Sequence, residues 1–595
     1  DLQEDPGNSS TVRGSYGIRV PNIFAPGKVT EDALKDADTD AIYYDETIID
    51  GKAGKVNLTG SHNVGISISK KIGGSGTGTN ATNDTYAETV QTVGSGPNAK
   101  QYNIGTGTMS VYNYQTGKGA NGTGLGGKAA GTTADLDNTG RDEKDLIGNI
   151  YNLNIVVDGK ENVGFLRNYD YMYGNYSPTI QSLVQNDFNI RDTHVNSIDF
   201  TSTADGGVLF RTDRYGINVL KNLTVTPGNA YIGDPNPLAP TDPTKNLNKR
   251  FNIVMLANGS VNSVVAGAPS GSNHDVNNPV KVKNSKAITI GTAGNTGYNM
   301  LGLMAYKGGE FQNKADITLN TKHSIALVVE GEGVRGAAKE ESSGTSNNSN
   351  IKMTGDNSIG VYNNGRNYTM NGGEINISGE KNVGVYAAGI PTLDHLGNVT
   401  GYSKLASTTL NDGSLKVAGK GSVGLYANGG SDIKLNNMTN MEVNENGLLF
   451  YGIKYGTDYS QLELTGNNTA TIKRGGYAFY FKNENLMNQV VKGGSTGKIY
   501  LTLQDGATLS VIEGDGTTPL LLSNVPVPSS NVTGDYEIAP GVVIKGNSGN
   551  YITTKSTKVN LQMDMDSNLD DKNDRYLNSE FSSSSITLLN GRSIK

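Results

Sequence analysis

Short apolar runs alternate with polar turns along most of the chain, and one pattern recurs. In Ile375-Asn376-Ile377, apolar and polar residues alternate; a polar turn follows, and Val383-Gly384-Val385 then places apolar residues two positions apart. A period of two predicts β-strands with one buried face, and neither run has helical spacing. We therefore expect a repeated unit of strand, turn and strand.

Six close copies of this unit share one internal spacing. In each, the first apolar residue lies nine positions before a Gly or an Ala, and the copies begin at Val56, Ile155, Ile317, Ile351, Ile375 and Leu415. Looser copies run from Ile198 to Phe210, from Met441 to Phe450 and from Ile472 to Phe481. A unit of this size cannot bury its own apolar face, so the copies must stack on one another.

The distances between copies predict the architecture. Taken as equivalent positions, Gly360, Gly384, Gly424 and Leu448 are separated by 24, 40 and 24 residues. Twenty-four residues suit one coil of a right-handed parallel β-helix, an all-β solenoid whose coils pair at a spacing of about 4.8 Å. Longer coils are then the same unit with an inserted loop. A propeller, a sandwich or a leucine-rich repeat fits this phrase less well. In register, one aromatic ladder is expected, formed by Tyr362, Tyr386, Tyr426, Phe450 and Tyr480.

The repeat also predicts the domain organisation. Residues 1–55 do not match it and are expected to form an N-terminal cap or preceding segment, and 56–485 form the β-helix. Irregular stretches predict long loop insertions at about 71–147, 165–197, 226–285 and 336–350. Residues 486–595 return to alternating strands without the tyrosine phrase, as further coils or as a C-terminal β module.

The composition fits a thin core drawn out along one axis. Only 35% of the 595 residues are hydrophobic, whereas 79 are Gly and 30 are Tyr. The absence of Cys excludes disulfides, Cys-ligated zinc and a thiol nucleophile. A net charge of −7 without a basic cluster argues against a nucleic-acid partner. No apolar stretch reaches the length of a membrane span.

Signals for catalysis or metal binding are weak, and we expect no enzyme, no cofactor and no metal site. The five His residues form no zinc-hydrolase motif. Gly493-Gly494-Ser495-Thr496-Gly497 matches a nucleophile elbow in letters, but a strand rather than a helix is expected after it. The acidic runs that begin at Asp36 and Asp564 lack the turn glycine and the final glutamate of a calcium loop. The carboxylate pair Asp570-Asp571 has no nearby His.

One insertion carries the densest aromatic patch of the chain, a tyrosine-rich segment that contains Tyr169, Asp170, Tyr171, Tyr173 and Tyr176. Arg167, just before it, adds a cation. Tyrosine offers a large, rigid contact area at low entropic cost, as in recognition loops. Alternate tyrosines can equally cover one face of a strand. The first interpretation makes these six residues a ligand-binding site, and the second makes the tyrosines packing.

The phrases Asn382-Val383-Gly384-Val385-Tyr386 and Ser422-Val423-Gly424-Leu425-Tyr426 resemble the repeats of fusobacterial type V autotransporter adhesins. The Gly/Asn/Lys-rich, Cys-free composition is similar too. The resemblance spans about residues 56–481, discontinuously. It implies a β-helical passenger at the bacterial cell surface, with a signal peptide and a C-terminal membrane barrel outside this chain.

The resemblance further implies coaggregation and host-cell binding. The expected partners are a host surface receptor or glycan, or surface proteins of other bacteria. Two alternatives remain: a β-helical polysaccharide lyase or hydrolase, which would cluster carboxylates on one coil face, and a structural spacer that binds nothing itself.

Overall fold

The computed structural model describes residues 16–20, 49–50, 55–68, 83–110, 150–167, 188–227, 251–259, 280–482, 491–513 and 533–556, with short gaps inside several of these ranges. All regular elements in these ranges are β-strands, and no helix occurs among them. The expected all-β class is confirmed. Most of residues 1–55, where a cap or preceding segment was expected, lies outside the described residues.

One long sheet contains a single strand from each coil, and we call it the first sheet. Neighbouring strands along it are parallel throughout. In order its strands are β1 (Tyr16–Val20), β4 (Val64–Ile68), β11 (Val163–Arg167), β14 (Val208–Thr212), β17 (Asn252–Asn258), β20 (Met300–Tyr306), β23 (Ile325–Glu330), β28 (Ile359–Asn364), β31 (Val383–Ala388), β36 (Val423–Asn428), β39 (Leu448–Tyr455), β42 (Tyr477–Lys482), β45 (Thr508–Glu513) and β48 (Ile552–Ser556).

A second long sheet takes two short strands from most coils, and we call it the second sheet. Its strands are β12 (Phe188–Ile190), β15 (Gly216–Val219), β16 (Leu223–Val225), β18 (Val280–Asn284), β19 (Ile288–Ile290), β21 (Gly309–Asn313), β22 (Ile317–Leu319), β26 (Ser343–Asn347), β27 (Ile351–Met353), β29 (Asn367–Asn371), β30 (Glu374–Ile377), β34 (Ala406–Asn411), β35 (Ser414–Val417), β37 (Ser431–Asn436), β38 (Met441–Val443), β41 (Gln461–Ile472), β43 (Val491–Lys492), β44 (Gly497–Leu503), β46 (Tyr536–Ala539) and β47 (Val542–Ile544).

Smaller sheets accompany the two long ones. One strand from each of three early coils forms a small parallel sheet. Its strands are β3 (Lys55–Leu58), β10 (Leu153–Val157) and β13 (Val195–Phe200). β2 (Ile49–Asp50) and β9 (Ile150–Tyr151) also pair in parallel. Antiparallel pairs join β5 (Asn83–Thr85) to β8 (Thr108–Ser110) and β6 (Thr89–Val93) to β7 (Lys100–Ile104), inside the insertion expected at 71–147.

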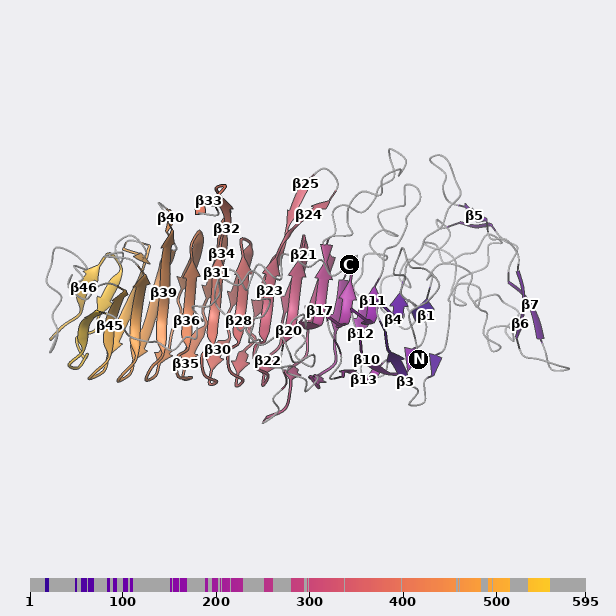
Figure 1. The fold of residues 1–595 in the computed structure, drawn as a ribbon, viewed down its shortest axis with the longest axis horizontal. Helices are drawn as coiled ribbons and strands as arrows, with labels where there is room; N and C mark the ends of the chain where they lie inside the picture. Colours follow the sequence, from indigo (N-terminus) through magenta and orange to yellow (C-terminus); the bar gives the residue numbers. More distant parts are fainter. Residues whose placement is uncertain are drawn as a thin grey trace, which may run out of the picture.

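A complete coil runs from β31 through β34 and β35 to β36, so it contains three strands. Figure 1 shows the strands of successive coils side by side in a row along the long axis of the molecule. The sequence predicted only the two strands on either side of the polar turn in each repeat. The strand type represented by β29 was missed, because its inward Tyr368 and Met370 alternate with polar residues in no fixed phrase.

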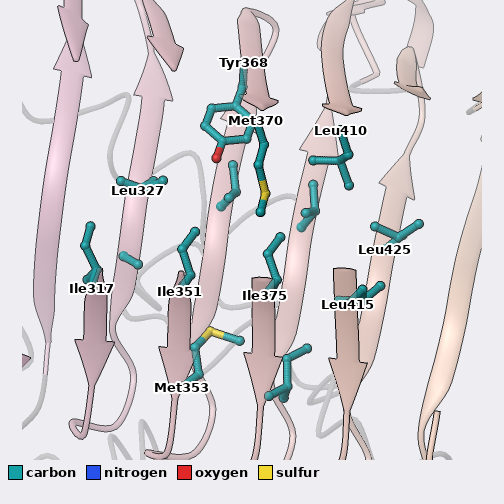
Figure 2. Packing of buried hydrophobic residues seen from close by; sticks show 14 of the residues in the cluster. Ile317, Leu327, Ile351, Met353, Tyr368, Met370, Ile375, Leu410, Leu415 and Leu425 are labelled. Atoms are coloured by element: carbon teal, nitrogen blue, oxygen red, sulfur yellow. The ribbon is translucent and has the colours of Figure 1, made fainter. Parts of the chain in front are cut away.

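The core follows directly from the alternation in the sequence. Ile317, Ile351, Ile375 and Leu415 pair one above the other and are fully buried, and Figure 2 shows them in a row that faces side chains of the other strands. The residues between them along each strand, such as Asn376, are partly exposed. Burying one such aliphatic side chain stabilises the fold by about 1.5–3 kcal/mol. Each added coil therefore extends one continuous core.

The small residue of the repeat is explained by the neighbouring coil. A Cβ atom on Gly384 would lie 2.6 Å from the carbonyl oxygen of Gly424 and 3.2 Å from Cδ1 of Ile377. The same approach recurs at Gly65, whose Cβ would lie 2.6 Å from the carbonyl oxygen of Gly164. The close approach of the next coil therefore explains why this position is a Gly or an Ala in the close copies of the repeat.

An aromatic ladder forms on the face of the first sheet opposite the core, and that face is buried as well. The ring centroids of Tyr362 and Tyr386 are 5.5 Å apart, and the following steps measure 5.0, 4.5 and 4.8 Å through Tyr426, Tyr451 and Tyr480. The prediction that Phe450 belongs to this ladder was wrong, because Tyr451 takes that place. Val423 pairs with Leu448, 25 positions later, so Phe450 pairs with Leu425 and packs in the core.

The boundaries of the coils differ in places from those expected. Within the segment assigned to an insertion at 226–285, β17 and β18 are strands of the two long sheets. β12 and β26 likewise join the second sheet inside the segments at 165–197 and 336–350. Within 486–595, β45 and β48 extend the first sheet as far as Ser556.

Candidate interaction surface

Most of the inserted segments leave the coils at one corner, where the first-sheet strands end and the chain turns towards the second sheet. Long connections follow β4, β11, β17, β31, β42 and β45 there. The opposite passage, back to the first sheet, is short in most coils, as between β30 and β31. The long connection from β16 to β17 is an exception. We call this insertion-bearing edge the loop corner.

Three antiparallel hairpins project from the loop corner. They comprise β24 (Glu332–Arg335) with β25 (Ala338–Glu341), β32 (Ile390–Leu393) with β33 (Val399–Lys404), and the end of β39 with β40 (Asp458–Tyr459). Figure 1 shows them along the same upper edge of the molecule. The first two are joined by an ion pair, with Nζ of Lys404 2.6 Å from Oε1 of Glu341. Hairpins from two coils that are separated by the coil of β28 are therefore joined directly.

Buried polar side chains line the foot of the loop corner. Arg211 forms two hydrogen bonds to Asp213, at 2.6 and 2.9 Å, and Asn258 of the next coil donates to the same carboxylate at 3.0 Å. Asn428 donates through Nδ2 to the hydroxyl oxygen of Tyr386 at 2.6 Å. Charged groups are retained inside a fold only when they are paired or hydrogen-bonded. These contacts hold the corner in one conformation.

Arg366 and Ser342 clamp the first hairpin at its base. Nε of Arg366 donates to the carbonyl oxygen of Gly331 at 2.7 Å, and Oγ of Ser342 donates to the carbonyl oxygen of Glu330 at 2.6 Å. Arg366 also donates to the carbonyl oxygen of Gly365 at 2.7 Å. The chain therefore leaves β23 and returns to β26 through a hydrogen-bonded junction.

Glu330 lies at this junction with its carboxyl group fully buried, beside the side chain of Asn364. Burial raises the pKa of Glu330 to about 8, against the opposing effects of the Arg366 charge, the Asn364 side chain and the Lys307 charge. The hydroxyl group of Tyr362 nearby is also buried, without a partner. Sequence reasoning missed Glu330, because an acidic residue at the end of a strand gives no sign that it is buried.

The second hairpin is anchored by packing and displays an apolar tip. The ring of Tyr402 occupies the space that a side chain on Gly430 would need, and Ile390 lies against Gly365. At the tip, the backbone N–H of Leu396 donates to Oδ1 of Asp394 at 2.8 Å, and the Leu396 side chain is 73% exposed. The sequence indicated only that this coil carries a loop.

Of the six residues predicted to bind a ligand, five lie outside the described residues: Tyr169, Asp170, Tyr171, Tyr173 and Tyr176. The segment that contains them follows β11 and so leaves from the loop corner. Arg167 is 1% exposed, and its guanidinium donates to the carbonyl oxygen of Gly216 in the next coil. Because its side chain is buried in this contact, Arg167 is a residue of the corner and not an exposed partner for a ligand.

The structure describes only some of the other residues that were considered for catalysis or metal binding. His62 pairs with Glu161 at 3.0 Å, and His323 is buried in a turn, where desolvation lowers its pKa to about 4. Strand β44 follows the Gly-rich match that begins at Gly493, as expected. The acidic runs at Asp36 and Asp564 and the pair Asp570-Asp571 lie outside the described residues.

Two features are absent from the described part of the chain. It holds no group of three or more His, Cys, Asp or Glu side chains placed to bind a metal ion. Nor does it contain a helix with the length and hydrophobicity that crossing a membrane requires.

No protein-family model, no curated protein and no solved structure matches this chain.

Proposed function

We propose that this chain is the passenger region of a bacterial surface adhesin, in which a right-handed parallel β-helix displays binding loops along one edge. Three strands per coil and parallel pairing between coils support the β-helix. The handedness rests on the general preference of parallel crossovers for the right-handed form. Backbone pairing over so many coils makes a stiff shaft without disulfides.

The observation that carries the binding function is the loop corner. A pure spacer needs only short turns, yet most insertions in this chain leave from one corner and two of the hairpins are linked by Lys404 and Glu341. Loops that a rigid scaffold positions on one side are the usual place for recognition. The partners we propose are a host surface receptor or glycan, or surface proteins of other bacteria, with the tyrosine-rich segment after β11 as one contact region.

The experiment is an adhesion assay with the whole chain coupled to fluorescent beads. Beads should bind cultured epithelial cells or bacteria of a second species above the level of albumin-coated beads. Replacing Tyr171 and Tyr173 with Ser should weaken binding without changing the melting temperature if this segment contacts the partner. Lost stability with a proportionate loss of adhesion would instead make these rings packing. No binding to any cell by the unaltered chain contradicts the adhesin proposal.

One observation favours a polysaccharide-cleaving enzyme as a second candidate. Asp432 and Glu463 lie on partly exposed positions of neighbouring second-sheet strands, and Lys434 pairs with Glu463 at 2.9 Å. Partial burial and the charge of Glu463 raise the pKa of Asp432, as a general acid requires. Release of reducing ends from a panel of polysaccharides, abolished by Asp432→Asn, would support this candidate. Equal and negligible release by both chains would eliminate it.

A further inference from the structure

A buried carboxyl group stands among uncharged residues in one column of the first sheet. Glu330, the last residue of β23, is fully buried there. The two coils before it and the three after it carry uncharged residues at the same position: Asn258, Tyr306, Asn364, Ala388 and Asn428. Asparagine thus fills this position elsewhere without a titratable group. Glu330 adds what packing alone does not require, a group that can lose a proton and gain a charge.

The cation that acts most strongly on Glu330 is used to hold the backbone. This cation is Arg366, whose guanidinium donates to two backbone carbonyl oxygens, and Nε reaches that of Gly331 at 2.7 Å. Asp213 has the contrasting arrangement, because Arg211 donates two hydrogen bonds directly to its carboxylate. Arg366 therefore fixes the main chain while the buried carboxyl group beside it stays neutral.

The carbonyl oxygen of Gly331 is the point where hairpin β24–β25 is fastened to the shaft. Oγ of Ser342, where the chain returns from the hairpin, donates to this oxygen at 2.9 Å, in addition to Nε of Arg366. The first residue pair of the hairpin, Glu332 with Glu341, follows directly. A change that draws the guanidinium away would therefore loosen the base of the hairpin.

The other groups around Glu330 keep their charge state near neutral pH. Lys307 contributes a second positive charge, and its Nζ lies 5.1 Å from the centroid of the Tyr306 ring. Burial and the charge of Glu330 raise the pKa of Tyr362, so its buried hydroxyl group keeps its proton. The side chain of Asn364 is uncharged. Glu330 is therefore the group of this cluster whose charge changes in that range.

We propose that Glu330 is a proton-operated latch for hairpin β24–β25. With its proton bound, the carboxyl group stays buried and Arg366 holds the carbonyl oxygen of Gly331. Once the proton is released to solvent, the carboxylate cannot stay buried without a partner. It draws Arg366 into an ion pair or admits water, and the base of the hairpin is released. Because Lys404 joins Glu341 to the second hairpin, release also changes how the two hairpins are displayed.

The hairpin is latched at low pH and released as the pH rises. The pKa of Glu330 is about 8 in the latched state, whereas the ordinary value is 4.5. Between these values the latched hairpin holds a proton that the released hairpin has lost. The ratio of released to latched hairpin should therefore rise up to about tenfold per pH unit in this range and level off above about pH 8.

A nitroxide probe on the full chain tests the latch directly. The chain contains no Cys, so one introduced cysteine takes a single probe. Ala338→Cys places it on β25 of the hairpin, and Thr409→Cys places a matched control on β34 of the shaft. Electron paramagnetic resonance then measures the mobile fraction of each probe from pH 4.5 to about 9.5. The hairpin probe should become mobile as the pH rises, whereas the shaft probe should not change.

Two further substitutions in the chain labelled at position 338 separate the latch from a general loosening. Glu330→Gln is neutral at every pH and should keep the hairpin probe immobile throughout. Lys307→Gln removes a charge that lowers the pKa of Glu330, so the rise should continue to higher pH.

Three results overturn the latch: a hairpin probe that stays immobile over the whole range, an equal response in Glu330→Gln, or simultaneous loosening of the shaft probe at position 409. The last result would mean that the shaft unfolds as a whole. The latch goes beyond the proposed adhesin function and does not depend on it, because its test needs no target cell. Failure of the adhesion assay would therefore leave this inference standing.

Discussion

The backbone N–H of Ser358 donates to the side-chain oxygen Oδ1 of Asn382, one coil further along, at 2.7 Å. The link is repeated in both directions. The backbone N–H of Asn382 donates to Oγ of Ser422 at 3.0 Å, and that of Ser324 donates to Oγ of Ser358 at 3.2 Å. All four side chains are fully buried. The Asn or Ser residue before each Val-Gly phrase therefore supplies the hydrogen-bond acceptor for a buried backbone N–H group in the turn of the preceding coil.

Removal of this link should destabilise the fold locally. Asn382→Ala leaves the N–H of Ser358 buried without a partner and should lower the free energy of unfolding by about 1–3 kcal/mol. Asn382→Ser should retain part of that stability, because Ser occupies the same position in the coils on either side. Urea unfolding followed by circular dichroism measures both changes. Equal stability of the Ala variant and the unaltered chain would contradict the assigned role.

Gly384→Val should also damage its coil. The new Cβ would meet the carbonyl oxygen of Gly424 at 2.6 Å, so the neighbouring backbone would have to shift. Overpacking of this kind costs about 1–3 kcal/mol. Limited proteolysis should cut faster near this coil, and the melting temperature should fall. An unchanged digestion pattern would show that the coils can separate there without cost.

Glu330 should make stability depend on pH. Its pKa is about 8 when folded and has the ordinary value of 4.5 in the unfolded chain, so the folded state keeps a proton that the unfolded state has lost. The stabilising contribution is complete below pH 4.5 and is lost as the pH rises to about 8. Over this window the free energy of unfolding should fall by a few kcal/mol.

The matched control is Glu330→Gln, a neutral residue of the same shape, which should remove this fall. His323 acts in the opposite direction, because its pKa is lowered to about 4 and its contribution is lost as the pH falls below 6.5. The quantity to measure is therefore the difference in the free energy of unfolding between the unaltered chain and Glu330→Gln at each pH. A difference that stays constant from pH 4.5 to 8 would mean that Glu330 titrates normally.

The stacked coils should make an elongated particle. Fourteen strands follow one another along the first sheet, and a spacing of about 4.8 Å gives a shaft of roughly 60 Å. Small-angle X-ray scattering should yield a pair-distance distribution with a long tail. A symmetric distribution typical of a sphere would contradict stacking along one axis.

The strands that the sequence predicted best are those with a buried aliphatic residue at every second position. Ile351, Ile375 and Leu415 were placed one above the other from spacing alone, because a one-residue slip would turn each strand's apolar side chains away from the core. The same rule explains the error at Phe450. The coil that ends there has one extra residue, and two adjacent aromatics, Phe450 and Tyr451, hid the slip.

The loop corner was much harder to predict. The sequence marked several stretches as insertions, but not that most of them leave from the same edge, because that depends on which of the three strands of a coil precedes each one. The strand before most insertions belongs to the first sheet, and the third strand type, such as β29, was not recognised. Leu396 and Glu330 show the same limit: one is exposed and one is buried, against the usual preference of each residue type.

The register of the coils has a consequence for how long such a molecule can be. Val383 pairs with Ile359 in one neighbouring coil and with Val423 in the other, and the same side-chain types meet at both contacts. A chain that lacked residues 359–382 would bring Ile325 against Val383 with every column of the core still matched. Reach can therefore lengthen or shorten in steps of about 4.8 Å, one coil at a time. Duplication or loss of a short, in-frame stretch of gene that encodes one coil would change the distance at which a hairpin meets its target.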